Sequence, residues 1–194
     1  MASDSRERMV RSAALLLREH GYAGTGFRDV IAHSEAPWGS IYHHFPGGKA
    51  QLAEEAVRYA GDLVAQLIEH SPPDDPVTTL RGFVALWRQG LETSEFRAGC
   101  PVVAVATEAP ADQPALSQAA AHAFAQWEQA LAATLRRAGI SRARARRLAT
   151  ITVAGIEGAI VLSRARRSTQ PLDDVGKELE LALRAAVEDA RAGR

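Results

Sequence analysis

Apolar residues recur every three or four positions along most of this chain, and the strict alternation typical of strands is hard to find. The sequence FRDVIAHSEAPWGSIYHHF, residues 27–45, contains two such helical patterns in close succession. Phe27, Val30 and Ile31 share one face of the first pattern, and SEAP at 34–37 interrupts it, because proline disfavours an α-conformation in the residue before it. Two helices joined by so short a turn can bury their faces only by crossing steeply. We therefore predict a helix-turn-helix, whose second helix has the size to enter a DNA major groove.

The whole pattern predicts an all-α fold of about nine helices. Breaks fall where proline and glycine gather, most clearly at SPPDDP, residues 71–76. The first three helices form a helix-turn-helix domain over residues 1–47, and residues 48–194, which open with a connecting helix over 48–70, form a larger bundle. In that connecting helix we expect a buried stripe of Leu52, Ala56, Tyr59, Leu63 and Leu67. The expected helices cover about residues 3–20, 27–33, 38–45, 48–70, 77–94, 101–110, 114–138, 141–167 and 172–192.

Composition narrows the possible functions without deciding among them. Lys and Arg total 23 and Asp and Glu total 23, whereas DNA-binding proteins often carry a basic excess, so the prediction of DNA binding rests on the motif. Cys100 is the only cysteine, which excludes a disulfide framework and a Cys-rich metal site. The chain shows no signal-peptide pattern and no uninterrupted apolar run near the roughly 20 residues that span a bilayer. We therefore expect a cytoplasmic protein without a membrane partner.

No constellation of side chains indicates catalysis or metal binding. His43 and His44 are neighbours on an expected helix and point about 100° apart, so they cannot easily share one metal ion. The spacing of His33, Glu35 and His43 matches no known set of zinc ligands. We expect no metal, no cofactor and no enzymatic activity.

The segment GYAGTGFRDVIAHSEAPWGSIYHHFPGGKAQL, residues 21–52, resembles the DNA-binding segment of the TetR family of transcriptional regulators. The string IYHHF, followed by a lysine that opens the next helix, is quite specific to that family. Gly47-Gly48-Lys49, together with Gly99-Cys100-Pro101 and the alanine–valine run after it, resembles the LmrA/YxaF-like branch. In the rest of the chain the resemblance lies mainly in the number and order of the helices.

The resemblance implies DNA-binding roles for individual residues. Thr25 would cap the helix from Phe27 and offer its hydroxyl to a phosphate, although Gly26 stands where the family usually has a second hydroxyl. Gly39 would let the recognition helix approach the bases, and Lys49 would hold a phosphate at the start of the next helix. The expected DNA-binding residues are Thr25, Arg28, Trp38, Gly39, Ser40, Tyr42, His43, His44 and Lys49.

Trp38 departs from the family pattern, because related sequences commonly place Lys or Arg there. An indole could stack on a sugar or pack on a thymine methyl group, which would lower the salt dependence of binding and shift the sequence preference. In the alternative interpretation, Trp38 simply covers the turn.

Two aromatic stripes suggest where a small molecule binds. Phe83 and Trp87 lie on the fifth expected helix, and Phe124 and Trp127 lie on the seventh. If these helices face one another, the stripes enclose either a filled core or a pocket for a drug-sized ligand. The resemblance favours the pocket, because such regulators commonly hold an inducer between these helices. We therefore expect an apolar or aromatic small-molecule inducer.

Four further residues complete the expected ligand site. Arg97, Cys100 and Val103 could form the mobile mouth of the pocket. Glu157 lies within an apolar run from Ile151 to Leu162, where an unpaired charge would be costly. It therefore faces a partner arginine, the ligand or water.

The last two expected helices, near 142–167 and 172–192, suggest a homodimer. Gly155 and Gly158 permit close approach of a second helix, and the resemblance implies that these two helices pair across a two-fold axis. A dimer would hold two recognition helices about 34–36 Å apart, at the spacing of successive major grooves.

The sequence thus predicts a ligand-responsive transcriptional regulator. It would be a repressor that binds a pseudo-palindromic double-stranded DNA operator as a dimer and is released by its inducer. The alternative is a dimeric small-molecule-binding or scaffold protein whose helix-turn-helix no longer reads DNA.

Overall fold

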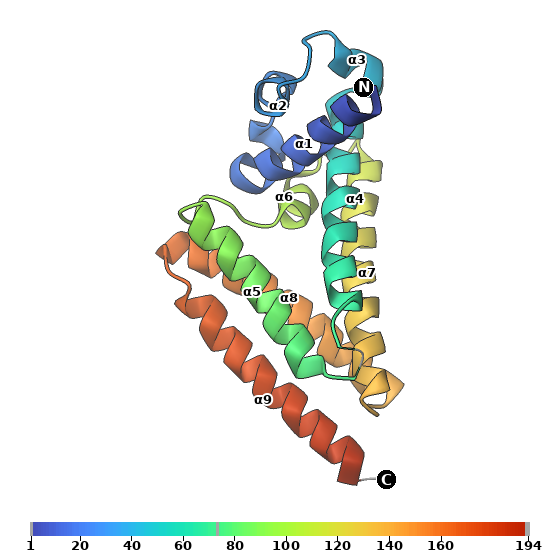
Figure 1. The fold of residues 1–194 in the computed structure, drawn as a ribbon, viewed down its shortest axis with the longest axis vertical. Coiled ribbons are helices and arrows are strands. Elements are labelled where there is room, and N and C mark those ends of the chain that lie inside the picture. The colour runs from blue at the N-terminus through green and yellow to red at the C-terminus, as the bar shows by residue number, and fades with distance from the viewer. Residues whose placement is uncertain (1, 73, 193–194) are drawn as a thin grey trace. The chain divides into compact units, whose positions relative to one another are not determined.

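The computed structural model describes residues 2–72 and 74–192, with side chains from Asp4 onward. Pro73, in the expected break at 71–76, lies outside these ranges. Within them the chain forms nine helices and no strands, as predicted (Figure 1). The helices are α1 (Ala2–Gly24), α2 (Phe27–Ser34), α3 (Ser40–His44), α4 (Gly48–Glu69), α5 (Pro76–Thr93), α6 (Pro101–Glu108), α7 (Pro114–Arg137), α8 (Arg142–Arg166) and α9 (Gln170–Ala192).

Most helix boundaries agree with the prediction to within two residues, and the end of α1 is the exception. Gly21, with φ 74° and ψ 178°, interrupts the regular helix just after its predicted end, and a further helical turn runs on to Gly24. Glycine adopts such a φ without a steric penalty, which explains the residue type at this position. Residues 21–24 are called the α1 bend below.

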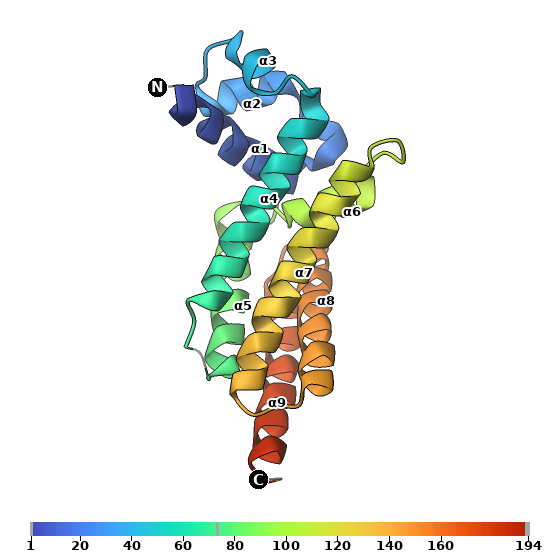
Figure 2. The ribbon, with the colours of Figure 1, turned by 90° about the vertical axis from the view of Figure 1, so that its right-hand side faces the viewer.

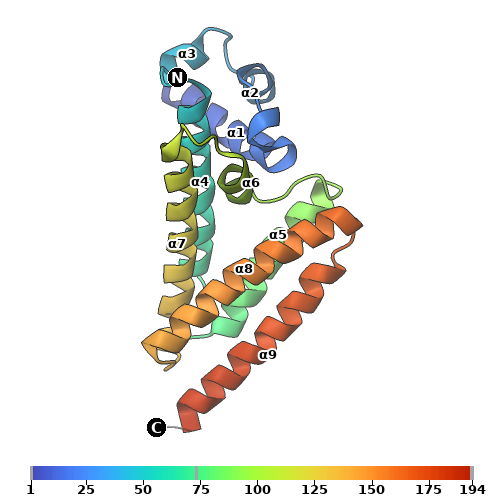
Figure 3. The ribbon, with the colours of Figure 1, turned by 180° about the vertical axis from the view of Figure 1, so that it is seen from behind.

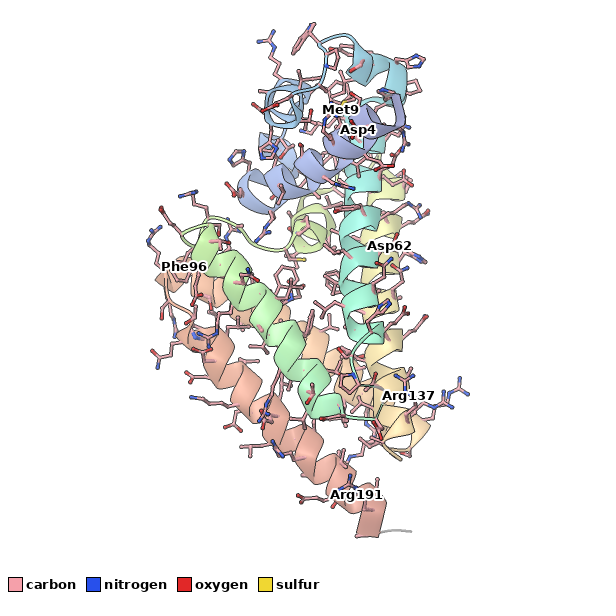
Figure 4. The ribbon with its side chains drawn as sticks, viewed as in Figure 1. Asp4, Met9, Asp62, Phe96, Arg137 and Arg191 are labelled. Carbon is pink, nitrogen blue, oxygen red and sulfur yellow. The ribbon has the colours of Figure 1, made fainter. Side chains whose placement is uncertain are left out.

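The chain folds into two compact units. The first unit contains the residues up to Asp62 together with Ala98–Ala123, and the second contains Leu63–Arg97 and the residues from Phe124 onward. Asp62 is labelled on α4 in Figure 4, at the point where this helix passes from one unit to the other. The functional division near residue 47 stays a prediction.

In the first unit, α1 packs against α2 and α6 (Figure 2). Phe27 was expected in the core with Val30 and Ile31, but it is only partly buried, and its ring meets Tyr42 edge-on at a centroid distance of 5.5 Å. The core side chains include Met9, Leu17, Val30, Ile31, Ile41 and Phe45.

The predicted stripe of α4 is partly wrong. Leu52 and Ala56 are buried as expected, but Tyr59 and Leu63 are exposed. Apolar side chains lie on more than one side of this helix, so spacing alone could not decide which row faces the core. The buried row instead includes Ala53, Val57, Val64, Ala65 and Ile68.

The second unit is a helical bundle in which α5 and α8 both pack against α9. α8 and α9 run in opposite directions from the turn that joins them (Figure 3). Two ion pairs join α5 to α9: Arg88 with Asp173, and Arg81 with Glu180 at 2.7 Å. Hydrogen bonds from Arg81 and then from Arg184 lower the pKa of Glu180 to about 2.

Among the described residues, α8 is the one helix that is long and apolar enough to cross a membrane by length and composition. Val153, Ile156 and Ile160 are buried in the protein, as in the core helix of a bundle. Ile151 and Val161, in contrast, are about half exposed on the same helix. The apolar character of α8 thus has two parts, a buried face and an exposed one.

Candidate nucleic-acid interface and ligand site

The helix-turn-helix is present, but Thr25 does not cap its first helix. The N-cap of α2 is Gly26, whose N–H donates to Asp29 Oδ2 at 2.9 Å. Thr25 is buried, and its hydroxyl donates to the carbonyl of Gly21 at 2.7 Å. The prediction of a Thr25 cap was therefore wrong. Asp29, the third residue of α2, accepts the hydrogen bond at the start of the helix, and the Thr25 hydroxyl instead closes the α1 bend.

The recognition segment presents large side chains to solvent. Trp38 is 56% exposed and Tyr42 is 62% exposed, although aromatic side chains of this size are usually buried. His43 is also exposed, and so is Arg28 on α2, which has no carboxylate partner among the described residues. These four side chains provide hydrogen-bond donors, one cation and two flat apolar faces.

Three other expected DNA-binding residues shape this segment. The Ser40 hydroxyl donates to the carbonyl of Pro37 at 2.7 Å and so closes the turn before α3. Apart from Gly39 and its two chain neighbours, no described residue has a heavy atom within 4 Å of the place where a side chain at Gly39 would begin, so this exposed backbone is open to a partner. The ring of His44 is half-buried and stands edge-on to both His43 and Phe45.

Lys49, at the start of α4, reaches back to the α1 bend. Its ammonium donates to the carbonyl of Ala23 at 3.2 Å and lies 4.5 Å from the centroid of the Tyr22 ring. Burial lowers the pKa of Lys49 below its ordinary value, and the negative charges of Glu108 and Asp29 act in the opposite direction. The lysine is therefore held in place within the first unit by a carbonyl, an aromatic face and two nearby carboxylates.

Two residues that the sequence pattern does not indicate, Glu108 and Gln113, hold the same bend. The N–H of Ala23 donates to Glu108 Oε2 at 3.0 Å, and the hydroxyl of Tyr22 donates to Gln113 Oε1 at 2.8 Å. Glu108 ends α6 and Gln113 follows it, and each is more than eighty positions from its partner along the chain. No local pattern signals pairs so distant, and only the packing of α1 on α6 brings them together.

The aromatic side chains of α5 and α7 lie against one another. The ring of Trp127 lies 6.3 Å from Phe83, 6.5 Å from Trp87 and 5.4 Å from Phe124, each in an edge-on arrangement. Such arrangements are the favourable ones for aromatic pairs. Phe83 and Trp127 are fully buried, whereas Phe124 is only partly buried. We name these four residues the aromatic cluster.

One polar atom of the aromatic cluster is unsatisfied. The indole Nε1 of Trp87 is buried and has no hydrogen-bond partner among the described residues. A buried donor without an acceptor costs about 1–3 kcal/mol, so an acceptor brought by a ligand would recover this cost.

The other expected ligand residues lie apart from this cluster in sequence and fall in both units. Glu157 is buried on α8 of the second unit. Arg97 belongs to the second unit, is exposed and pairs with Glu95 at 3.0 Å. Cys100 and Val103 belong to the first unit, where Cys100 is buried at the N-cap of α6. A shared pocket mouth for these residues stays a prediction.

Comparison with known proteins identifies the family. Residues 10–56 match the family described as bacterial regulatory proteins of the tetR family, and residues 76–178 match the LmrA/YxaF-like C-terminal domain of transcriptional regulators. An uncharacterized HTH-type transcriptional regulator of Mycobacterium tuberculosis is 44% identical over 180 residues, which cover 90% of this chain and 91% of that protein. The HTH-type transcriptional regulator LmrA of Bacillus subtilis is 36% identical over 171 residues, which cover 87% and 91% of the two chains.

Solved structures share the fold. A TetR regulator from Legionella pneumophila matches with a TM-score of 0.81 at 20% identity, and the match covers 91% of this chain and 95% of that one. A TetR regulator from Chloroflexus aurantiacus matches with a TM-score of 0.75 at 29% identity, covering 93% and 94%. These proteins are regulators of transcription and not enzymes. The chain therefore belongs to the TetR family of bacterial transcriptional regulators, and its C-terminal part to the LmrA/YxaF-like branch.

Proposed function

We propose that this regulator is a cytoplasmic repressor that binds a pseudo-palindromic operator as a homodimer and leaves it when an apolar or aromatic small molecule binds. The observation that carries the proposal is the exposure of Trp38 and Tyr42 on the recognition segment. Tryptophan is highly buried on average, so an exposed Trp38 together with an exposed Tyr42 favours a surface that a partner covers. DNA is the partner that this motif fits.

The proposed DNA contacts are of four kinds: ionic, hydrogen-bonding, apolar and backbone. Arg28 and Lys49 would neutralise phosphates, and Tyr42, His43 and His44 would donate to phosphates or base edges. Trp38 would add an apolar contact in place of the cation that related sequences carry. Gly39 would allow the backbone to come close to the bases. Ser40 and Thr25 would contribute least, because each hydroxyl already donates to a backbone carbonyl.

Exposed apolar side chains on α8 and α9 support the homodimer. Ile151, Val161 and Leu162 are exposed on α8, and Leu181 is exposed on the neighbouring helix α9. Exposed apolar side chains on two helices that pack together favour a surface that a second subunit covers. A two-fold pair formed through it would carry two recognition segments, as a pseudo-palindromic operator requires.

The aromatic cluster supports a ligand that is apolar or aromatic and carries one hydrogen-bond acceptor. The rings would contact its apolar body, and the unsatisfied Trp87 Nε1 would donate to the acceptor. Glu157 and Arg97, which belong to the same unit as the aromatic cluster, would complete the site, and the part expected for Cys100 and Val103 of the first unit stays a prediction. A coupling free energy of roughly 1–3 kcal/mol, or about 5- to 150-fold in DNA affinity, would release an operator.

Fluorescence anisotropy tests the proposal directly. The purified protein is titrated into labelled DNA from upstream of its own gene and into a scrambled control, at several salt concentrations. We expect nanomolar binding to a specific site and much weaker binding to the control. A genome-wide selection of binding sites completes the test. If the protein binds every DNA with the same affinity, the proposal is contradicted and a scaffold role is favoured.

A further inference from the structure

The α1 bend is held on both sides of Ala23. The Ala23 N–H donates to Glu108 Oε2 from α6 at 3.0 Å, and the Ala23 carbonyl accepts from the Lys49 ammonium at 3.2 Å. All three residues lie in the first unit. One residue of the bend thus links the last side chain of α6 to the first cation of α4.

The fit between Glu108 and the bend is close. A Cβ atom added at Gly21 would lie 2.4 Å from Glu108 Oε1, and Gly21 has a φ of 74°. The glycine therefore meets two requirements at once, a backbone conformation that side chains disfavour and room for a carboxylate. The Thr25 hydroxyl donates to the Gly21 carbonyl and ties the start of α2 to the same place.

A second residue, Gln113 in the chain after α6, holds the Tyr22 ring against which the Lys49 ammonium lies. Gln113 Oε1 accepts from the hydroxyl of Tyr22, and the Lys49 ammonium lies 4.5 Å from the centroid of that ring. Cations are attracted to aromatic faces at such distances. Both features that hold the Lys49 ammonium, the Ala23 carbonyl and the Tyr22 ring, are therefore fixed by residues at or just after the end of α6.

We infer that Glu108 is a positioning residue for operator binding: through Ala23 it sets the position of the Lys49 ammonium and so controls one phosphate contact per subunit. The inference rests on the proposed function and deepens it, because it names a place where a movement of α6 would change DNA affinity. Glu108 itself contacts no DNA in this scheme.

Two substitutions separate the hydrogen bond from the charge. Glu108→Gln keeps an oxygen that accepts from the Ala23 N–H, whereas Glu108→Ala removes the acceptor. Glu178→Ala is the matched control, because Glu178 is an exposed glutamate on α9 that makes no hydrogen bond or ion pair with the described residues. Thermal unfolding of each variant shows whether the fold is intact before other measurements are compared.

The first measurement needs no DNA. The sequence has two lysines, Lys49 and Lys177, so reductive ¹³C-methylation, which keeps their charge, gives one NMR signal from each side chain besides the terminal amine. The ring of Tyr22 shifts the Lys49 signal upfield, and exposed Lys177 serves as the internal reference. We expect Glu108→Ala to move the Lys49 signal towards that of Lys177, and Glu108→Gln and Glu178→Ala to leave it in place. An unmoved signal in Glu108→Ala overturns the inference.

The second measurement is the dependence of operator affinity on salt, whose slope changes by about 0.9 for each phosphate contact. Lys49→Ala and Glu108→Ala should each lose about 0.9 per subunit, Glu108→Gln should keep the wild-type slope, and the double variant should lose no more than Lys49→Ala alone. The inference is overturned if Glu108→Ala keeps the wild-type slope. It is also overturned if the slope losses of the two single variants add in full in the double variant. Neither result contradicts operator binding itself. If the unmodified protein prefers no operator, the proposed function fails, and the positioning role fails with it even where the NMR signal moves.

Discussion

Trp38 is an exposed indole at a position where the resemblance to the TetR family implies a lysine or arginine, and we expect this side chain to affect how strongly salt weakens DNA binding. Replacement by lysine, Trp38→Lys, adds a charge that can neutralise a phosphate. We expect the slope of log affinity against log salt to become steeper by about 0.9 per subunit, as measured by anisotropy. The control Trp38→Phe keeps an apolar ring and should keep the slope. If Trp38→Lys leaves the slope unchanged, the indole only covers the turn.

Among the helices, α5 shows how one side chain defines where an element starts. The carboxylate of Asp75 accepts from the N–H groups of Val77 and Thr78 at 3.1 and 3.0 Å. The hydrogen bond from the Thr78 side chain, followed by that from its N–H, lowers the pKa of Asp75. We expect Asp75→Ala to lower the free energy of unfolding by about 1 kcal/mol at neutral pH in urea titrations at a fixed protein concentration.

The effect of Asp75 should depend on pH in a defined direction. Because its pKa is lower in the folded protein than in the unfolded chain, its contribution is full above the ordinary pKa of an aspartate and is lost as the pH falls through the lowered value. The difference between wild type and Asp75→Ala should therefore shrink in acid. Asp74→Ala changes the neighbouring exposed carboxylate and should have little effect at any pH. A constant difference across pH would contradict the capping role.

Helical periodicity and turn residues predicted the order and nearly all boundaries of the helices, because each signal lies within a few positions of the element that it defines. The same signals failed where two residues could serve the same helix end, or where two faces of one helix were both apolar enough to be buried. Asp29 rather than Thr25 serves the start of α2, and the buried face of α4 includes Val57 and Ile68 in place of Tyr59 and Leu63. The contact of Glu108 with Ala23 depends on the packing of α6 on α1, which no pattern along the chain encodes.

At the scale of the whole molecule, the exposed apolar face of α8 and α9 should decide the assembly state. Leu181→Glu places a charge at a leucine that is 60% exposed, and we expect the protein to sediment as a monomer and to bind its operator far more weakly. Burial of an unpaired charge in an interface is costly, which gives the direction of the effect. Leu15→Glu makes the same change at an exposed leucine on α1 and should leave the dimer intact. A dimeric Leu181→Glu would place the subunit contact elsewhere.

The discontinuous first unit bears on how regulators of this kind can be recombined. Its N-terminal helices are completed by Ala98–Ala123, a segment encoded after the whole of α5. A chimera with a single crossover at residue 62 would join Ala23 and Lys49 to a foreign α6, whose last residue need not be a carboxylate. We therefore expect transfer of operator specificity to another sensor to need two exchanged segments, with Glu108 and Gln113 carried alongside the helix-turn-helix.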